Sequence, residues 1–191
     1  MRISKSGFTV VELLTVIVVM GILASITVVV YNGIQGRAYA STAIAARSAY
    51  VKALKLYRVD NGRYPIVTGG ATVCLGAVSD YPAKDGFASG QCKYSDYGGG
   101  SIGSDATITA DLKRYISLPS LGWPMATETY TGFGKDYYRG IFYYAGTEAN
   151  QGADAYVWYY LPGSHTCPTA DGGYGSYDSS TGETQCTILI R

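Results

Sequence analysis

A single carboxylate interrupts the long apolar segment near the start of this 191-residue chain. Glu12 stands between Val11 and Leu13, and the next charged residue is Arg37. A carboxylate inside a membrane costs about 2.5–3.5 kcal/mol on insertion scales, so a chain that keeps one usually has a functional use for it. Alternatively, Glu12 lies at the membrane interface and its side chain reaches water. The spacing alone leaves both interpretations open.

Other side chains that could do chemistry are few. The chain has four cysteines and one histidine, His165, and no two cysteines form a CxxC pair. Zinc sites normally take four ligands at short spacings, so none is expected. A lone loop histidine is most often a surface residue, and no Walker A or HExxH motif is present. We therefore expect neither an enzyme nor a cofactor.

The four cysteines allow three disulfide connectivities. We favour the pairs Cys74–Cys92 and Cys167–Cys186, because both close local loops. All four cysteines lie beyond residue 70. This placement suits an oxidising compartment outside the cytoplasm.

The charge balance excludes one large class of partner. There are 15 Lys and Arg against 14 Asp and Glu, a formal net charge of +1. Proteins that bind nucleic acid through bulk electrostatics are normally strongly basic, so the sequence gives no strong nucleic-acid signal.

The apolar segment itself reads as a membrane-spanning helix. Residues 13–30 are apolar on nearly every face, and at 1.5 Å per residue they extend about 27 Å, close to the hydrocarbon thickness of a bilayer. Arg2 and Lys5 precede them, so the positive-inside rule places the N-terminus in the cytoplasm. No signal-peptidase site of the A-x-A type follows, so we expect the segment to be kept.

The start of the chain resembles the type III signal of type IV pilins and pseudopilins. The match lies in Lys5-Ser6-Gly7-Phe8-Thr9-Val10-Val11-Glu12-Leu13-Leu14, which combines a basic leader, a Gly–Phe junction, a glutamate at a fixed offset and an unbroken apolar run. The resemblance implies cleavage between Gly7 and Phe8 by a prepilin peptidase and N-methylation of Phe8. It also implies that Glu12 serves filament assembly.

The proposed pairing of these groups has a physical basis. The α-amine of Phe8 would stay cationic after methylation and could pair with the Glu12 carboxylate of a neighbouring subunit. Either charge is costly in an apolar bundle without its partner, so the pair would fix the register of each added subunit.

The rest of the chain divides into a helical arm and a head. Apolar residues from Tyr39 to Tyr57 recur at spacings of three and four, which predicts an amphipathic helix that packs on the protein's own head. Gly33 and Gly36 mark a bend or a segment that unwinds. Helix-ending signals follow at Asn61-Gly62 and Pro65.

The head reads as a small antiparallel sheet, with Tyr and β-branched residues in the strands. We expect strands at 71–78, 140–145, 155–161 and 185–190, and a short helix at 109–116. The predicted fold is α+β and pilin-like, with a long N-terminal helix packed on the sheet. The predicted divisions are a leader at 1–7, a transmembrane and assembly helix at 8–31, an amphipathic arm at 32–62 and a head at 63–191.

Three acidic residues, Asp171, Asp178 and Glu183, punctuate a Gly/Ser-rich loop near the C-terminus. Similar loops in some pseudopilins bind calcium, and oxygen ligands from a flexible loop would suit that ion. The EF-hand spacing is absent, and we favour a solvated loop without a metal.

The resemblance implies a structural subunit of a type IV pilus or related surface filament, supporting adhesion, motility or DNA uptake. It would lie in the cytoplasmic membrane before assembly and in an extracellular filament afterwards. Its partners would be further copies, other pilins, the prepilin peptidase, an inner-membrane assembly platform and membrane lipid. The alternatives are a pseudopilin of a type II secretion or competence system and, in another class, a solitary membrane-anchored ectodomain.

Overall fold

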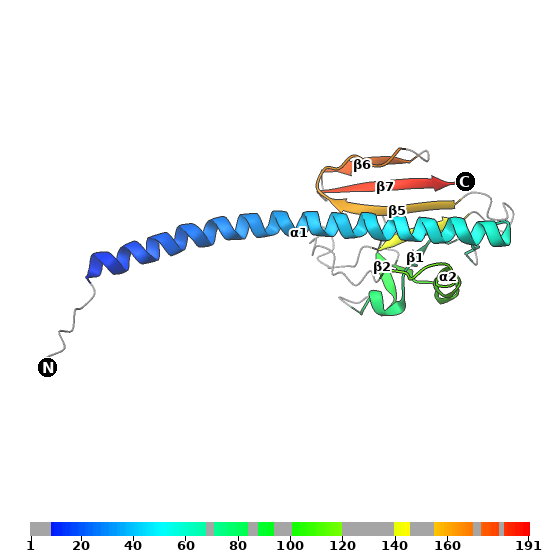
Figure 1. Ribbon diagram of the computed structural model, residues 1–191, viewed down its shortest axis with the longest axis horizontal. Coiled ribbons are helices and arrows are strands. Elements are labelled where there is room, and N and C mark those ends of the chain that lie inside the picture. Colours follow the sequence, from blue (N-terminus) through cyan, green and yellow to red (C-terminus); the bar gives the residue numbers. More distant parts are fainter. Residues whose placement is uncertain are drawn as a thin grey trace. The chain divides into compact units, whose positions relative to one another are not determined.

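The computed structural model describes residues 9–67, 71–83, 88–93, 101–119, 140–145, 155–169, 173–179 and 182–191. Its longest element is the helix α1, Val10–Asn61, which has 52 residues (Figure 1). The chain forms two compact units, Met1–Ala38 and Tyr39–Arg191, and the division falls within α1. Gly33 and Gly36, where a bend was expected, both lie within α1.

Helix α1 ends where the sequence predicts. Gly62 has a φ of 72°, a left-handed backbone that glycine adopts without steric cost. Its amide donates to the carbonyl of Arg58 at 2.8 Å, and the side chain of Asn61 donates to the carbonyl of Tyr57 at 2.9 Å. These bonds satisfy carbonyls that the end of a helix would otherwise leave without donors.

The second unit contains one five-stranded antiparallel sheet with the strand order β1-β4-β5-β7-β6. Its strands are β1 (Val73–Leu75), β4 (Ile141–Ala145), β5 (Ala155–Pro162), β7 (Glu183–Ile190) and β6 (Tyr174–Asp178). The smaller elements are the hairpin strands β2 (Gln91–Lys93) and β3 (Ser101–Gly103), the helix α2 (Ala106–Leu112) and a 3-10 turn at Val78–Asp80.

One face of this sheet packs against the C-terminal part of α1, which runs alongside β5 in Figure 1. Tyr50 and Leu54 of α1 have no exposed surface, and they share one apolar core with Val157 of β5 and Ile188 of β7. The amphipathic stripe thus packs on the head as expected. The long helix with an antiparallel sheet confirms the predicted α+β fold.

Three local predictions were wrong. The short helix spans Ala106–Leu112 rather than 109–116, because the carboxylate of Asp105 accepts the amides of Thr107 at 2.8 Å and Ile108 at 3.0 Å and so caps it earlier. Strand β1 stops at Leu75, since Gly76 has a φ of 137° and a 3-10 turn follows. Strand β6 occupies residues that were expected to be a loop.

Tyrosines carry much of this core. Tyr50, Tyr81 and Tyr143 are at most 1% exposed. Their hydroxyls donate to backbone carbonyls, from Tyr81 to Leu75 and from Tyr143 to Pro65 at 2.6 Å, and from Tyr50 to Pro119 at 3.4 Å. Burial raises the pKa of all three phenols above the ordinary value, because a buried phenolate would lose its hydration.

These raised pKa values predict unfolding at alkaline pH. Below about pH 10 the phenols are neutral in both states, and their contribution to stability is fully present. Above that pH the unfolded chain ionises while the folded chain does not, so the free energy of unfolding should fall by at most about 4 kcal/mol per pH unit for three groups. Urea unfolding from pH 8 to 11.5, with phenolate absorbance followed in parallel, measures this. Ionisation of all tyrosines near pH 10 in a still-folded chain would contradict it.

Candidate functional site

The first turn of α1 is closed by a reciprocal pair of side chains. The amide and the hydroxyl of Thr9 both donate to Oε2 of Glu12, each at 2.8 Å. In return, the Glu12 amide donates to the Thr9 hydroxyl at 3.3 Å. This is a capping box, which satisfies helix amides that have no carbonyl partner within the helix. The sequence signal, T-x-x-E, was present at Thr9–Glu12, but the sequence analysis considered only the glutamate.

The carboxylate of Glu12 remains open to an external partner. Among the described residues, the cap engages only Oε2, and the Glu12 side chain is exposed. A helix N-terminus also favours an anion at this position. Chemically, the arrangement holds a carboxylate in a fixed position from which Oε1 can accept a cationic donor from another molecule.

The remaining residues of the proposed processing site lie outside the described residues. These are Gly7 and Phe8 at the expected cleavage junction, and Arg2 and Lys5 in the basic leader. Their roles stay predictions.

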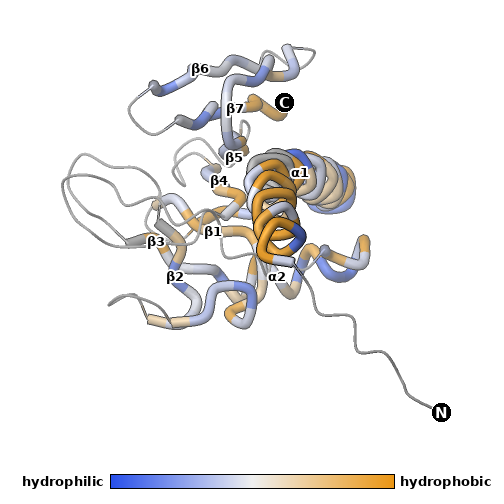
Figure 2. Tube along the Cα trace, turned by 90° about the vertical axis from the view of Figure 1, so that its left-hand side faces the viewer, coloured by the Kyte–Doolittle hydropathy of each residue, from blue (hydrophilic) through white to orange (hydrophobic). Residues whose placement is uncertain are grey.

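The helix surface around Glu12 is apolar and exposed. Residues Val10–Thr27 have a mean hydropathy of 2.4, and none of this stretch is buried, so it is long and apolar enough to cross a membrane. Figure 2 shows this part of α1 mostly in the hydrophobic colour. The hydroxyls of Thr15, Ser25 and Thr27 each donate to a carbonyl three residues earlier, at 2.7–2.9 Å. Glu12 is therefore the one ionisable group on this surface.

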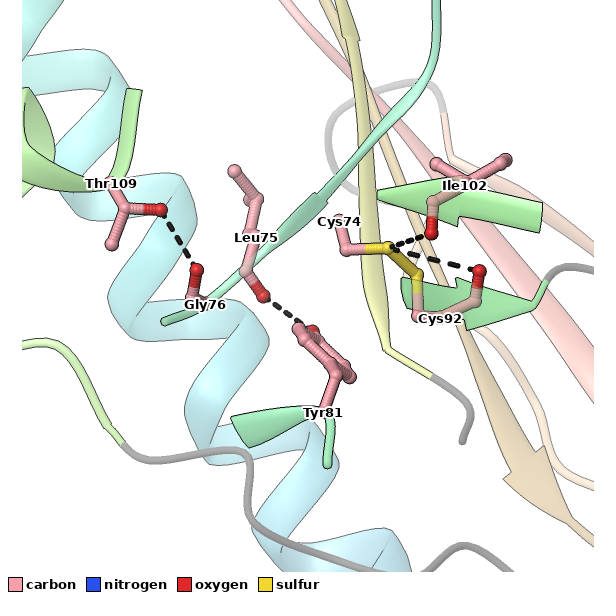
Figure 3. The surroundings of a disulfide bond; sticks show 7 residues. All are labelled: Cys74, Leu75, Gly76, Tyr81, Cys92, Ile102 and Thr109. Carbon is pink, nitrogen blue, oxygen red and sulfur yellow. Dashed lines mark hydrogen bonds between the residues drawn. A yellow bond between two sulfur atoms is a disulfide. The ribbon is translucent and has the colours of Figure 1, made fainter. Parts of the chain in front are cut away.

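The cysteines form the two pairs that the sequence favoured. Cys74 is bonded to Cys92, with Cα atoms 6.3 Å apart, and Cys167 is bonded to Cys186, with Cα atoms 5.4 Å apart. Figure 3 shows the first bridge, where the Cys74 sulfur lies 3.3 Å from the carbonyl oxygen of Ile102. This bridge links β1 to the β2–β3 hairpin, and the other links β7 to the segment after β5.

Asp178 and Glu183 lie in strands rather than in the expected loop, which corrects the expectation. Asp178 ends β6 and Glu183 begins β7, and the two are paired across that ladder. Glu183 is only 4% exposed. Asp171 lies outside the described residues. Within the described part of the chain, no group of three His, Cys, Asp or Glu side chains could hold a metal ion.

His165 occupies an exposed turn, as the sequence suggested. Its amide donates to the hydroxyl of Thr184 at 2.9 Å, and its Nε2 lies 2.9 Å from the carbonyl oxygen of Pro162. These contacts hold the segment after β5 against the start of β7 and assign the histidine no chemistry.

One glycine-rich segment matches two short motifs in letters alone. Residues 98–103 read G-G-G-S-I-G, which fits both G-x-G-x-x-G and G-x-S-x-G. Each motif works only at a turn from a strand into a helix, where it holds a phosphate or presents a nucleophile. Here Ser101–Gly103 form β3, which pairs antiparallel with β2, so neither structural context is met.

Comparison with known proteins identifies relatives over part of the chain. No family model matches the chain, and no solved structure matches it. The chain is 41% identical over 69 residues to the type II secretion system core protein G of Klebsiella michiganensis, which covers 36% of this chain and 49% of that protein.

Two further relatives carry the same name. The protein from Aeromonas hydrophila is 34% identical and that from Klebsiella pneumoniae 33% identical, each over 86 residues and 45% of this chain. The matches span 60% and 61% of those two proteins, so the chain covers between half and three fifths of the length of these relatives. Over the matched residues the chain is therefore similar to type II secretion system core protein G, and its exposed apolar helix and antiparallel sheet are consistent with a pilin-like fold.

Proposed function

We propose that this protein is a structural subunit of a type IV pilus or related filament, assembled through its N-terminal helix. The observation that carries the proposal is the Glu12 carboxylate, which lies at the exposed start of an apolar helix and is held by Thr9 through one oxygen. In a filament, the free oxygen of each subunit would accept the methylated α-amine of a neighbour's Phe8.

The capping box is compatible with cleavage between Gly7 and Phe8. It uses only the amide and hydroxyl of Thr9 and the amide and carboxylate of Glu12, all of which remain in the cleaved chain. Cleavage would therefore leave the carboxylate in place and add a cationic amine one residue before Thr9. The helix would enter the membrane before assembly and pack against other helices afterwards, with the prepilin peptidase and an inner-membrane assembly platform as transient partners.

A second candidate within the same mechanism is a subunit of a type II secretion pseudopilus. The names of the relatives favour it, since all three of those described are core protein G of that system. A pilus subunit and a pseudopilin can be distinguished by experiment. A pilus subunit is found in filaments sheared from cells, whereas loss of a pseudopilin abolishes secretion without loss of surface filaments.

Processing provides the direct test of the proposal. We expect the mature chain to begin at an N-methylated Phe8, which intact-mass measurement of membrane-extracted or filament protein detects. Gly7→Val should retain the leader, because a branched side chain then flanks the cleaved bond. Ser6→Ala, which leaves the Gly–Phe junction intact, should mature normally. A wild-type chain that keeps residues 1–7, or that is cut after Val30, would overturn the proposal and favour a solitary ectodomain.

A further inference from the structure

The face of the sheet opposite α1 carries a row of aromatic side chains. Alternation along the strands directs Tyr143, Val157 and Tyr159 into the core with α1, and so directs their neighbours to the other face. Across the ladders the register then aligns Phe142, Trp158, Thr187 and Tyr174 in one row, and Tyr144 with Tyr156 in the next.

This aromatic row borders an open hollow of about 230 Å³. The described residues that line it are Tyr144, Tyr156, Trp158, Tyr174, Gln185 and Thr187. Two of these tyrosines present much of their surface, since Tyr174 is 65% exposed and Tyr156 is 36% exposed. The hollow therefore has aromatic side chains in its lining, together with the amide of Gln185 and the hydroxyl of Thr187.

The part of the wall formed by Trp158 and Gln185 is fixed by contacts within the protein. Trp158 stacks on Phe142 with ring centroids 5.6 Å apart and planes 12° apart, and Phe142 meets Tyr160 edge-on at 6.0 Å. Tyr160 in turn donates a long hydrogen bond of 3.4 Å to Oε1 of Gln185. A preformed wall lowers the entropic cost of binding.

The hollow is uncharged at neutral pH. Its described lining contains no Asp, Glu, Lys, Arg or His. By contrast, the hollow along α1 is lined by Arg47, Lys52 and Lys55, so it suits anions. A charged ligand would find no counter-ion among the aromatic residues, whereas a neutral ligand with both apolar faces and hydroxyl groups would complement them.

We propose that this aromatic hollow is a binding site for an uncharged oligosaccharide. The C–H faces of a pyranose ring are apolar and match the exposed rings of Tyr156 and Tyr174, which combine an apolar body with a polar tip. The sugar hydroxyls match the Gln185 amide, the Thr187 hydroxyl and the tyrosine hydroxyls. Apolar walls with a few convergent polar groups are the general form of a small-ligand site.

The test uses the full chain in a sugar-free zwitterionic detergent, because maltoside headgroups would compete. Cellohexaose, mannohexaose and chitohexaose are titrated by calorimetry and by tryptophan fluorescence, which Trp158 should report. A hyaluronan hexasaccharide serves as the anionic comparison and a decaproline peptide as the aromatic-groove comparison. At least one neutral hexasaccharide should bind, and both comparison probes should bind at least tenfold more weakly.

The variants locate the site. Tyr174→Ala and Tyr156→Ala should each weaken binding at least tenfold. Tyr177→Ala is the matched control. Tyr177 is a half-exposed tyrosine of β6, the strand that carries Tyr174, but it does not line the hollow, so this variant should bind as wild type. Formation of both disulfides verifies that each variant is folded.

Three results would each overturn the proposal. The first is no binding of any neutral hexasaccharide at millimolar concentration, and the second is binding that persists in both tyrosine variants or falls equally in Tyr177→Ala. The third is tighter binding of decaproline than of the sugars, which would indicate a peptide groove.

Discussion

Replacing Glu12 with alanine should abolish or sharply reduce filament assembly, while the chain still enters the membrane and is still cleaved after Gly7. Loss of one partner of a buried ion pair costs about 3–5 kcal/mol, much of it from the charge left behind. Here that charge would be the methylated amine of Phe8 at every subunit interface. Insertion should not suffer, because the segment becomes more apolar without the carboxylate. Filament yield, membrane content and intact mass measure the three steps separately.

Two further variants separate the charge of Glu12 from its role as a cap. Thr9→Ala removes the hydroxyl that contacts Oε2 but leaves the carboxylate, and its cost should be near the 1 kcal/mol typical of a lost cap. Glu12→Gln keeps an oxygen for the Thr9 amide and removes the charge. Ion pairing predicts that Glu12→Gln fails to assemble and Thr9→Ala succeeds. The reverse pattern would mean that Glu12 acts by capping, and normal assembly of Glu12→Ala would refute the pairing mechanism.

The elements that the sequence predicted well are those specified by local signals. The end of α1 follows from Asn61-Gly62, whose backbone preference needs no tertiary context. The packing face of α1 follows from spacing, since residues such as Ala46 and Leu54 recur on one side of the helix. The apolar run that contains Glu12 can be recognised from composition alone. In each case the residues that determine the element lie close together in the chain.

The elements that were missed depend on distant partners. Strand β6 reads Tyr-Gly-Ser-Tyr-Asp, a composition typical of a turn, and all five residues are exposed. Its strand conformation comes from the ladder with β7, where Tyr174 pairs with Thr187 and Asp178 with Glu183. That pairing also places the Glu183 side chain among buried residues, which a loop assignment could not show. The aromatic hollow was missed for the same reason, because its walls come from four strands.

The two sides of α1 in the second unit should respond differently to the same substitution. Leu54 is fully buried against the sheet, whereas Leu56, two residues later, is 37% exposed. Leu54→Ala should lower the free energy of unfolding by about 2–5 kcal/mol, because it removes buried methyl groups and leaves a cavity. Leu56→Ala, at an exposed position, should change it by no more than about 0.5 kcal/mol. Urea unfolding of the full chain in detergent measures both.

Under the proposed filament function, the exposed side of α1 should matter for filament assembly rather than for the stability of the subunit. The exposed side of α1 carries Ile44, Leu56 and Val59, which are 39%, 37% and 79% exposed and so are available to the helices of neighbouring subunits. Leu56→Ala should therefore reduce filament yield while its stability stays at the wild-type level. A stable Leu56→Ala chain that assembles normally would show that this side of α1 makes no interface. A Leu54→Ala chain as stable as wild type would instead contradict the packing of α1 on the sheet, because a fully buried leucine cannot be truncated there without loss of contacts.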